Sequence, residues 1–178
     1  MELKGKRVAI LAENQYQELE LWYPLYRFRE EGAEVIVVGS GSSDTYNSKH
    51  GYPVKVDTSA DKVKGVDFDC VSVPGGYAPD YMRRYPAMLR LVKDAFDHGM
   101  VIGAICHAGW VLVSAGILKG KKVTCVSAIR DDIVNAGAEY INAEVVRDGN
   151  LVTSRIPDDL PAFMREIIKA IKEIFIHR

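Results

Sequence analysis

Short apolar runs rich in β-branched residues alternate along this chain with segments of helical periodicity. Apolar runs of this length predict buried strands. They are residues 7–12, 34–39, 68–73 and 101–105. Because strands that alternate with helices build a parallel sheet covered on both faces, the pattern predicts an α/β fold with a mostly parallel central sheet.

The segments between these runs complete the expected order of elements. Helices are expected at about residues 18–31, 87–98 and 158–174. Pro24, inside the first of them, predicts either a kink or a later helix start. A polar loop is expected at 41–52, and further strands at 54–56, 122–126, 143–147 and 151–154. The turn sequence at 148–150 joins the last two strands as a hairpin.

Length and composition limit the classes of protein that fit. The chain has 178 residues and a formal net charge of −1, which suits one domain over residues 1–178 and offers no basic surface for nucleic acid. No apolar stretch is long enough to cross a membrane, and the N-terminal residues do not form a secretion signal. Three widely spaced cysteines favour neither disulfides nor a zinc site, so we expect a cytoplasmic protein. No metal-ligand spacing or glycine-rich nucleotide motif indicates a cofactor, and none is expected.

The run at 101–105 ends at Cys106, where a helical pattern begins. A cysteine at a strand-to-helix turn lies near a helix N-terminus, which favours the reactive thiolate. Small residues flank Cys106, as a tight elbow requires. A free cysteine is more often a small buried apolar residue, but the turn and the adjacent His107 favour a nucleophile.

Backbone N–H groups that could stabilise an oxyanion follow two strands. Gly75 and Gly76 come directly after the strand at 68–73, and His107 follows the cysteine. Because ligands bind beyond the carboxyl ends of parallel strands, these groups are expected near Cys106. A sequence such as Pro74-Gly75-Gly76 is otherwise an ordinary turn.

Acidic residues that could assist the thiol lie in two loops. Glu18 and Glu20 are two residues apart, so on a helix they cannot share a face. A carboxyl in a partly apolar pocket has a raised pKa and can donate a hydrogen bond to a thiolate, whereas a solvated first-turn acid is the commoner role. The residues alone leave the choice between these two open. Asp80 is a candidate to orient His107. The other histidines have weaker claims; they are His50, His98 and His177.

Several ordered motifs resemble the PfpI family of intracellular cysteine proteases, a branch of the superfamily that includes Parkinson disease protein seven. The motifs are E-L-E-L-W-Y-P (18–24), K-H-G-Y (49–52), V-P-G-G-Y-A-P-D (73–80), A-I-C-H (104–107), S-A-G-I-L-K-G (114–120), D-D-I-V-N-A-G-A (131–138) and V-T-S-R-I-P-D-D-L (152–160). The resemblance implies a flavodoxin-like three-layer sandwich and homodimers that often assemble into hexamers.

The resemblance also assigns roles to site residues. It implies Cys106 as the nucleophile, Glu20 as the carboxyl hydrogen-bonded to it, His107 as the next member of the triad, and an acid from a neighbouring subunit at the position of Asp80. The chain departs from the family pattern in two places. Gln15 and Gln17 stand where acids are expected, and Ala108-Gly109-Trp110 replaces the frequent Gly-Pro, which alters the wall of the site.

The resemblance implies an enzyme whose Cys106 attacks a carbonyl group. Peptide bonds are one substrate class, and methylglyoxal with its protein adducts is the other, as in glyoxalase III and deglycase activities. An aldehyde requires fewer catalytic groups than a peptide, because peptide cleavage also requires a general acid for the leaving amine. A different class is a redox-sensing stress protein or chaperone with an oxidisable Cys106. A class I glutamine amidotransferase is excluded because its late H-x-E pair is missing; the only late histidine is His177.

Overall fold

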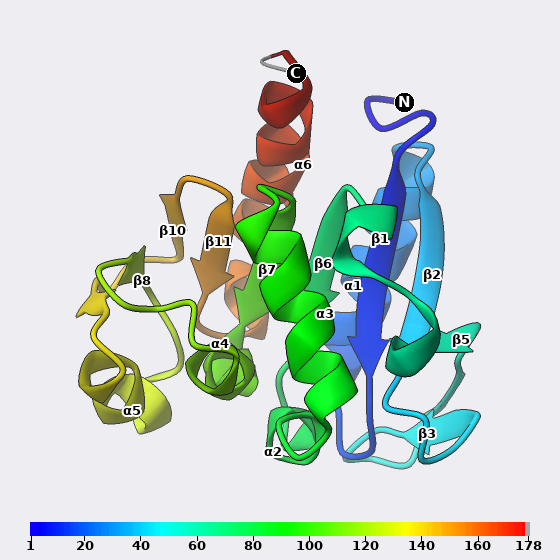
Figure 1. Cartoon of the computed structure of the whole chain (residues 1–178), viewed down its shortest axis with the longest axis horizontal. Helices are drawn as coiled ribbons and strands as arrows, with labels where there is room; N and C mark the ends of the chain where they lie inside the picture. The colour runs from blue at the N-terminus through cyan, green and yellow to red at the C-terminus, as the bar shows by residue number, and fades with distance from the viewer. Residues whose placement is uncertain (177–178) are drawn as a thin grey trace.

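The structure is a computed structural model that describes residues 1–176 (Figure 1). Seven strands form the main sheet: β1 (Arg7–Ala12), β2 (Glu34–Gly39), β5 (Thr58–Ser59), β6 (Cys70–Val73), β7 (Val101–Ile105), β10 (Val145–Asp148) and β11 (Leu151–Ser154). Their spatial order is β10-β11-β7-β6-β1-β2-β5. Every pairing is parallel except that of β10 with β11, which is antiparallel. The expected mostly parallel sheet and the terminal hairpin are therefore confirmed.

Helices cover both faces of this sheet. The α-helices of the described residues are α1 (Glu18–Glu30), α2 (Ala78–Met82), α3 (Pro86–Asp97), α4 (Gly109–Ala115), α5 (Arg130–Asn135) and α6 (Leu160–Ile176). Helices α1 and α6 pack against each other on one face, and α3 and α4 lie on the other (Figure 1). The result is the three-layer flavodoxin-like sandwich, in which the carboxyl ends of β1, β6 and β7 meet at one edge.

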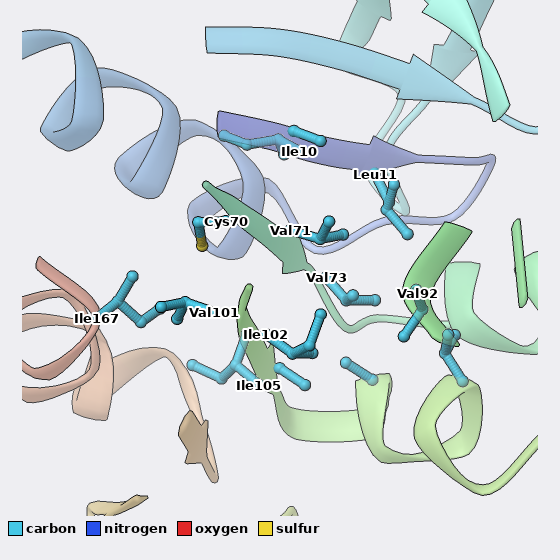
Figure 2. Packing of buried hydrophobic residues seen from close by; sticks show 14 of the residues in the cluster. Ile10, Leu11, Cys70, Val71, Val73, Val92, Val101, Ile102, Ile105 and Ile167 are labelled. Atoms are coloured by element: carbon cyan, nitrogen blue, oxygen red, sulfur yellow. The ribbon is translucent and has the colours of Figure 1, made fainter. Parts of the chain in front are cut away.

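The core lies between the sheet and these helices. The central strands β1, β6 and β7 are almost fully buried, since both faces are covered. Figure 2 shows Val92 of α3 and Ile167 of α6 on opposite sides of Ile102. Continuous apolar strands of this kind are typical of parallel sheets. They hold the loops at the carboxyl edge on a rigid base.

The smaller elements complete the chain. Two-stranded sheets are formed by β3 (Thr45–Asn47) with β4 (Pro53–Lys55) and by β8 (Lys122–Val123) with β9 (Glu139–Tyr140). Short 3₁₀ turns are η1 (Ala60–Lys62), η2 (Gly65–Asp67), η3 (Cys106–Ala108), η4 (Ser127–Ile129) and η5 (Pro157–Asp159). Within residues 1–176, no helix combines the length and apolar character needed to span a lipid bilayer. His177 lies outside the described residues.

The helix expected at about 18–31 is confirmed as α1, and of the two outcomes expected from Pro24 the later start is wrong, because the Gln17 side chain accepts the Glu20 N–H at 3.0 Å and caps the first turn. Two further expectations about local structure are wrong. The segment 41–52 is not all loop: it contains β3, whose Tyr46 is fully buried. The strand expected at 122–126 ends at Val123, because the Thr124 N–H donates to the Thr153 hydroxyl at 2.9 Å instead of to a backbone carbonyl.

Candidate active site

Cys106 occupies a strained elbow at the carboxyl end of β7. Its φ angle is 62°, in the left-handed region that non-glycine residues avoid. This conformation costs about 1 kcal/mol for an L-residue and turns the chain abruptly from β7 into η3 and α4. Backbone strain retained at such a turn is typical of a nucleophile elbow. The side chain is half-buried, whereas Cys70 and Cys125 are buried.

Glu20 provides a buried carboxyl behind the cysteine. It is 1% exposed, and its Oε2 accepts the Gly75 N–H at 2.7 Å. Its Oε1 is buried and accepts no hydrogen bond from the rest of residues 1–176. Burial raises the pKa of Glu20 to about 7, although the Gly75 N–H and the interaction with Cys106 oppose the rise. Much of the Glu20 population is therefore protonated in neutral solution and can donate to sulfur.

The thiol of Cys106 is harder to ionise than its position in the sequence suggests. Burial first, and then the negative charge of Glu20, raise its pKa to about 12, while the N–H groups of His107 and Gly76 act in the opposite direction. The expectation that the elbow alone favours thiolate is therefore wrong, because desolvation outweighs the two donors. Since each anion disfavours the other, the pair of Glu20 and Cys106 carries at most one negative charge near pH 7. A thiolate thus forms next to a protonated Glu20.

The two glycines after β6 have different roles. The N–H of Gly75 is committed to Glu20, so it does not face an oxyanion as predicted. A Cβ atom at Gly75 would lie 2.5 Å from Glu20 Oε2 and 2.8 Å from Cys106 Cβ, so only glycine fits between them. The N–H of Gly76 hydrogen-bonds the sulfur. Gly76 has φ of 74° and is pressed against the loop after β1, where its Cβ would lie 2.5 Å from the carbonyl oxygen of Gln15.

The imidazole of His107, the residue directly after Cys106, lies close to the sulfur. Its Nδ1 lies 3.4 Å from Cys106 Sγ. Burial, and then the positive charge of Lys49, lower the pKa of His107, so the imidazole is mostly neutral near pH 7. A neutral imidazole at this distance can accept the thiol proton and return it later.

Asp80 is not brought to His107 within the chain. It lies on α2 and forms an ion pair with Arg84, one turn further on. No hydrogen bond joins Asp80 to His107 in the part of the chain that the structure describes. The idea that Asp80 orients His107 of the same chain is therefore not supported, because Arg84 engages its carboxylate. A contact between subunits is a separate proposal.

The structure resolves which of the two glutamates after β1 contacts the cysteine. Glu18 faces away from Glu20 and accepts hydrogen bonds from the Ser48 hydroxyl and from the His50 backbone and ring. These donors lower the pKa of Glu18 to about 2 against the opposing effect of burial. Glu18 thus holds the loop around Ser48 in place, whereas Glu20 interacts with the Cys106 thiol.

Lys49 is a site residue that the sequence interpretation missed. Its backbone N–H donates to the Tyr16 carbonyl at 3.0 Å, and Tyr16 bridges both Ser48 and Gly76. The loop is thereby fixed beside the active cysteine, and the charge of Lys49 lowers the pKa values of Glu20 and His107. The K-H-G-Y motif at 49–52 includes Lys49, but the sequence around it does not predict that this loop lies at the carboxyl edge of the sheet.

The backbone role of Gln15 is a second feature that the sequence interpretation missed. It has φ of 67°, the only positive value besides that of Cys106 among the described non-glycine residues. Its carbonyl accepts the N–H groups of Tyr77 and Ala78. The strained loop after β1 therefore holds the Gly76 turn against the elbow.

Together these features define an α/β protein with a half-buried cysteine on a strained strand-to-helix elbow, next to a buried carboxyl and two backbone donors. Within residues 1–176 no cluster of three or more histidine, cysteine, aspartate or glutamate side chains has metal-binding geometry. Residues 6–170 match the profile of the DJ-1/PfpI family, and the chain belongs to this family.

Curated relatives match over most of their length. The chain is 44% identical to deglycase PH1704 of Pyrococcus horikoshii over 166 residues, 93% of this chain and 99% of the relative. It is 40% identical to protein/nucleic acid deglycase 2 of Escherichia coli, over 93% and 97% of the two chains. Among solved structures, Drosophila melanogaster DJ-1beta superposes with a TM-score of 0.85 at 28% identity, covering 95% of each chain.

Proposed function

We propose that this protein is a cysteine-dependent enzyme of the hydrolase and glyoxalase type, in which the Cys106 thiolate attacks a carbonyl carbon. The observation that carries the proposal is the contact of Cys106 with a buried Glu20, whose pKa is raised to about 7, and with the N–H groups of Gly76 and His107. These groups stabilise negative charge first on sulfur and then on the oxygen of an adduct. The relatives named deglycases support the same chemistry.

The reaction begins with proton removal from the Cys106 thiol by the neutral His107 imidazole, whose Nδ1 is 3.4 Å from Sγ. The thiolate adds to the aldehyde carbon of methylglyoxal and forms a hemithioacetal. A proton then moves from the first carbon to the second, which leaves a lactoyl thioester on sulfur. Water hydrolyses the thioester to lactate and restores the thiol, so methylglyoxal and water give lactate with no other reactant.

Small carbonyl compounds and their protein adducts suit this site better than peptides. An aldehyde accepts the thiolate without losing a leaving group, whereas peptide cleavage requires a proton for the departing amine. Within residues 1–176 no carboxylate is hydrogen-bonded to His107, and Asp80 pairs with Arg84. Peptides remain the second substrate class, which fits the name of the putative cysteine protease YraA of Bacillus subtilis, 38% identical to this chain.

The direct test is lactate formation from methylglyoxal by wild-type protein and by Cys106→Ala. Many turnovers by the wild type, lost in the variant, are expected. A folded and reduced wild-type protein that forms no lactate would refute the glyoxalase reaction, and peptide cleavage would then be measured with the same pair. One stoichiometric oxidation at Cys106 without turnover would instead favour the redox-sensing stress protein, whose sulfinate the same donors would stabilise.

Self-association and location belong to the same proposal. We expect a homodimer or a hexamer, and exposed apolar side chains on α1 and the nearby Tyr52 support it: Leu19, Tyr23, Tyr26 and Tyr52 are 56, 37, 59 and 58% exposed. Asp80 would then act on His107 only across a subunit contact. Three unpaired cysteines suit a reducing compartment, and we expect the cytoplasm.

A further inference from the structure

Trp110 is held rigidly beside the reactive cysteine. Its side chain is half-buried in the first turn of α4. The indole Nε1 donates to Asp132 Oδ2 at 2.9 Å, and the Arg83 guanidinium lies 5.8 Å from the ring centroid. Arg83 is itself fixed by a 2.9 Å hydrogen bond from its Nε to the Ser114 hydroxyl. Contacts from Asp132 on α5 and from Arg83, which follows α2, therefore fix the orientation of this indole.

Trp110 forms an aromatic corner with Tyr77 and His107. Its ring centroid lies 5.0 Å from that of His107, with 61° between the planes, and 6.4 Å from that of Tyr77, with 89° between the planes. Tyr77 is 48% exposed, so the corner is open to solvent on that side. Edge-to-face arrangements of this kind leave ring surface that a further aromatic group can contact.

The aromatic corner adjoins the point where an adduct would form. His107 follows Cys106 directly, and Tyr77 follows Gly76 directly. The N–H groups of His107 and Gly76 are the two that hydrogen-bond the sulfur. Each N–H donor that would hold an adduct oxygen therefore belongs to, or directly precedes, a residue whose ring is part of the corner.

We infer that Trp110 is a specificity-determining residue that favours carbonyl compounds with an aromatic substituent over those with a small alkyl group. The inference rests on the proposed attack of Cys106 on a carbonyl and names the preferred substrate class. Because Asp132 and Arg83 already hold the indole, a flat substituent gains ring contact without the cost of ordering the side chain. An aromatic contact of this kind corresponds to about a two- to tenfold preference.

The test compares two alkylating agents that differ by one phenyl ring. The rates at which iodoacetanilide and iodoacetamide alkylate Cys106 are measured by peptide mass spectrometry, and their ratio is compared with that for N-acetylcysteine. Since Cys70 and Cys125 are buried, the modification is assigned to Cys106. Trp110→Leu is expected to lower the ratio about two- to tenfold, whereas Trp110→Phe retains most of it.

Controls separate recognition from a general structural effect. Trp22→Leu makes the same substitution at the other tryptophan of the chain, which lies on α1 and contacts Tyr26 of the same helix and Tyr52 instead, and is expected to leave the ratio unchanged. If Trp110→Leu does not fold, Asp132→Ala frees the indole and is expected to lower the ratio partially. An unchanged ratio, or an equal fall in both rates, would overturn the inference.

A second measurement addresses the substrate class. The kcat/KM ratio of phenylglyoxal to methylglyoxal is expected to fall in Trp110→Leu by the same factor as the alkylation ratio. If the wild-type protein turns over neither compound, the proposed function fails, while the alkylation ratio still decides the role of Trp110. If both compounds are turned over and the ratio does not change, the inference about Trp110 fails alone.

Discussion

Replacing Glu20 with glutamine is expected to stabilise the folded protein at pH 8 and to leave its stability nearly unchanged at pH 4. The carboxyl has a pKa of about 7 in the folded protein, against an ordinary value of 4.5. Ionising Glu20 within the folded protein therefore costs about 3 kcal/mol relative to the unfolded chain. Glutamine carries no charge, and its side-chain oxygen can still accept the N–H of Gly75.

The sign of the pH dependence follows from proton binding. The folded state holds the Glu20 proton more tightly than the unfolded chain does, so this contribution to stability is full below about pH 4.5 and is lost as the pH rises to about 7. At pH 8 the variant is expected to exceed the wild type in free energy of unfolding by up to about 3 kcal/mol. At pH 4 the two should agree to within about 1 kcal/mol.

Urea unfolding followed by circular dichroism, at pH 4 and pH 8 and at one protein concentration, measures this difference. Glu30→Gln is the matched control, because the Glu30 side chain is 72% exposed on the same helix and its replacement should change stability by less than about 0.5 kcal/mol. Equal stabilities of wild type and Glu20→Gln at pH 8, or a difference that is the same at both pH values, would refute a buried carboxyl of raised pKa.

Four further outcomes are expected. The rate of Cys106 alkylation by iodoacetamide should show an inflection near pH 7, where Glu20 titrates, and Glu20→Gln should remove it; a persistent inflection would assign it to another group. Gly75→Ala should lower activity about tenfold or more, because the added Cβ would lie 2.5 Å from Glu20 Oε2. Unchanged steady-state kinetics in a variant of verified fold would contradict this. Glu18→Gln should destabilise the protein at pH 7 but not below about pH 2, because its folded pKa of about 2 is depressed; identical unfolding curves at pH 7 would contradict this. Asp80→Ala should reduce activity only in the assembled oligomer, and an equal effect in an active monomer, checked by size-exclusion chromatography, would remove the role across subunits.

Much of the fold was predictable because it depends on local pattern. The apolar runs at β1, β2, β6 and β7 are buried on both faces, so their composition alone identifies them. The helix at 158–174 was predicted from its apolar face and is observed as Leu160–Ile176. The small elements were predicted less well. The strand expected at 122–126 is observed only as β8 (Lys122–Val123), because the Thr124 N–H donates to a side chain 29 residues away, and the local sequence does not predict such a bond.

The candidate site was likewise predictable in part from the sequence. The turn after β7 marks Cys106 from the sequence, and the motifs place Glu20 and the glycines near it. The thiol pKa was predicted in the wrong direction, because a helix N-terminus is a local feature whereas desolvation depends on everything packed around the sulfur. Lys49 was missed because Tyr16 connects its loop to Gly76 only in the folded chain.

The sequence by itself determined the layered α/β architecture and the elbow, and it marked Cys106 as the candidate nucleophile, since each depends on the order and type of neighbouring residues. Only the tertiary structure decided that the Gly75 N–H binds the Glu20 carboxyl, that Asp80 pairs with Arg84, and that Trp110 adjoins His107. These choices depend on distances that exist only in the folded chain. Burial and charge act through space, so packing and not sequence order sets the chemistry of Cys106.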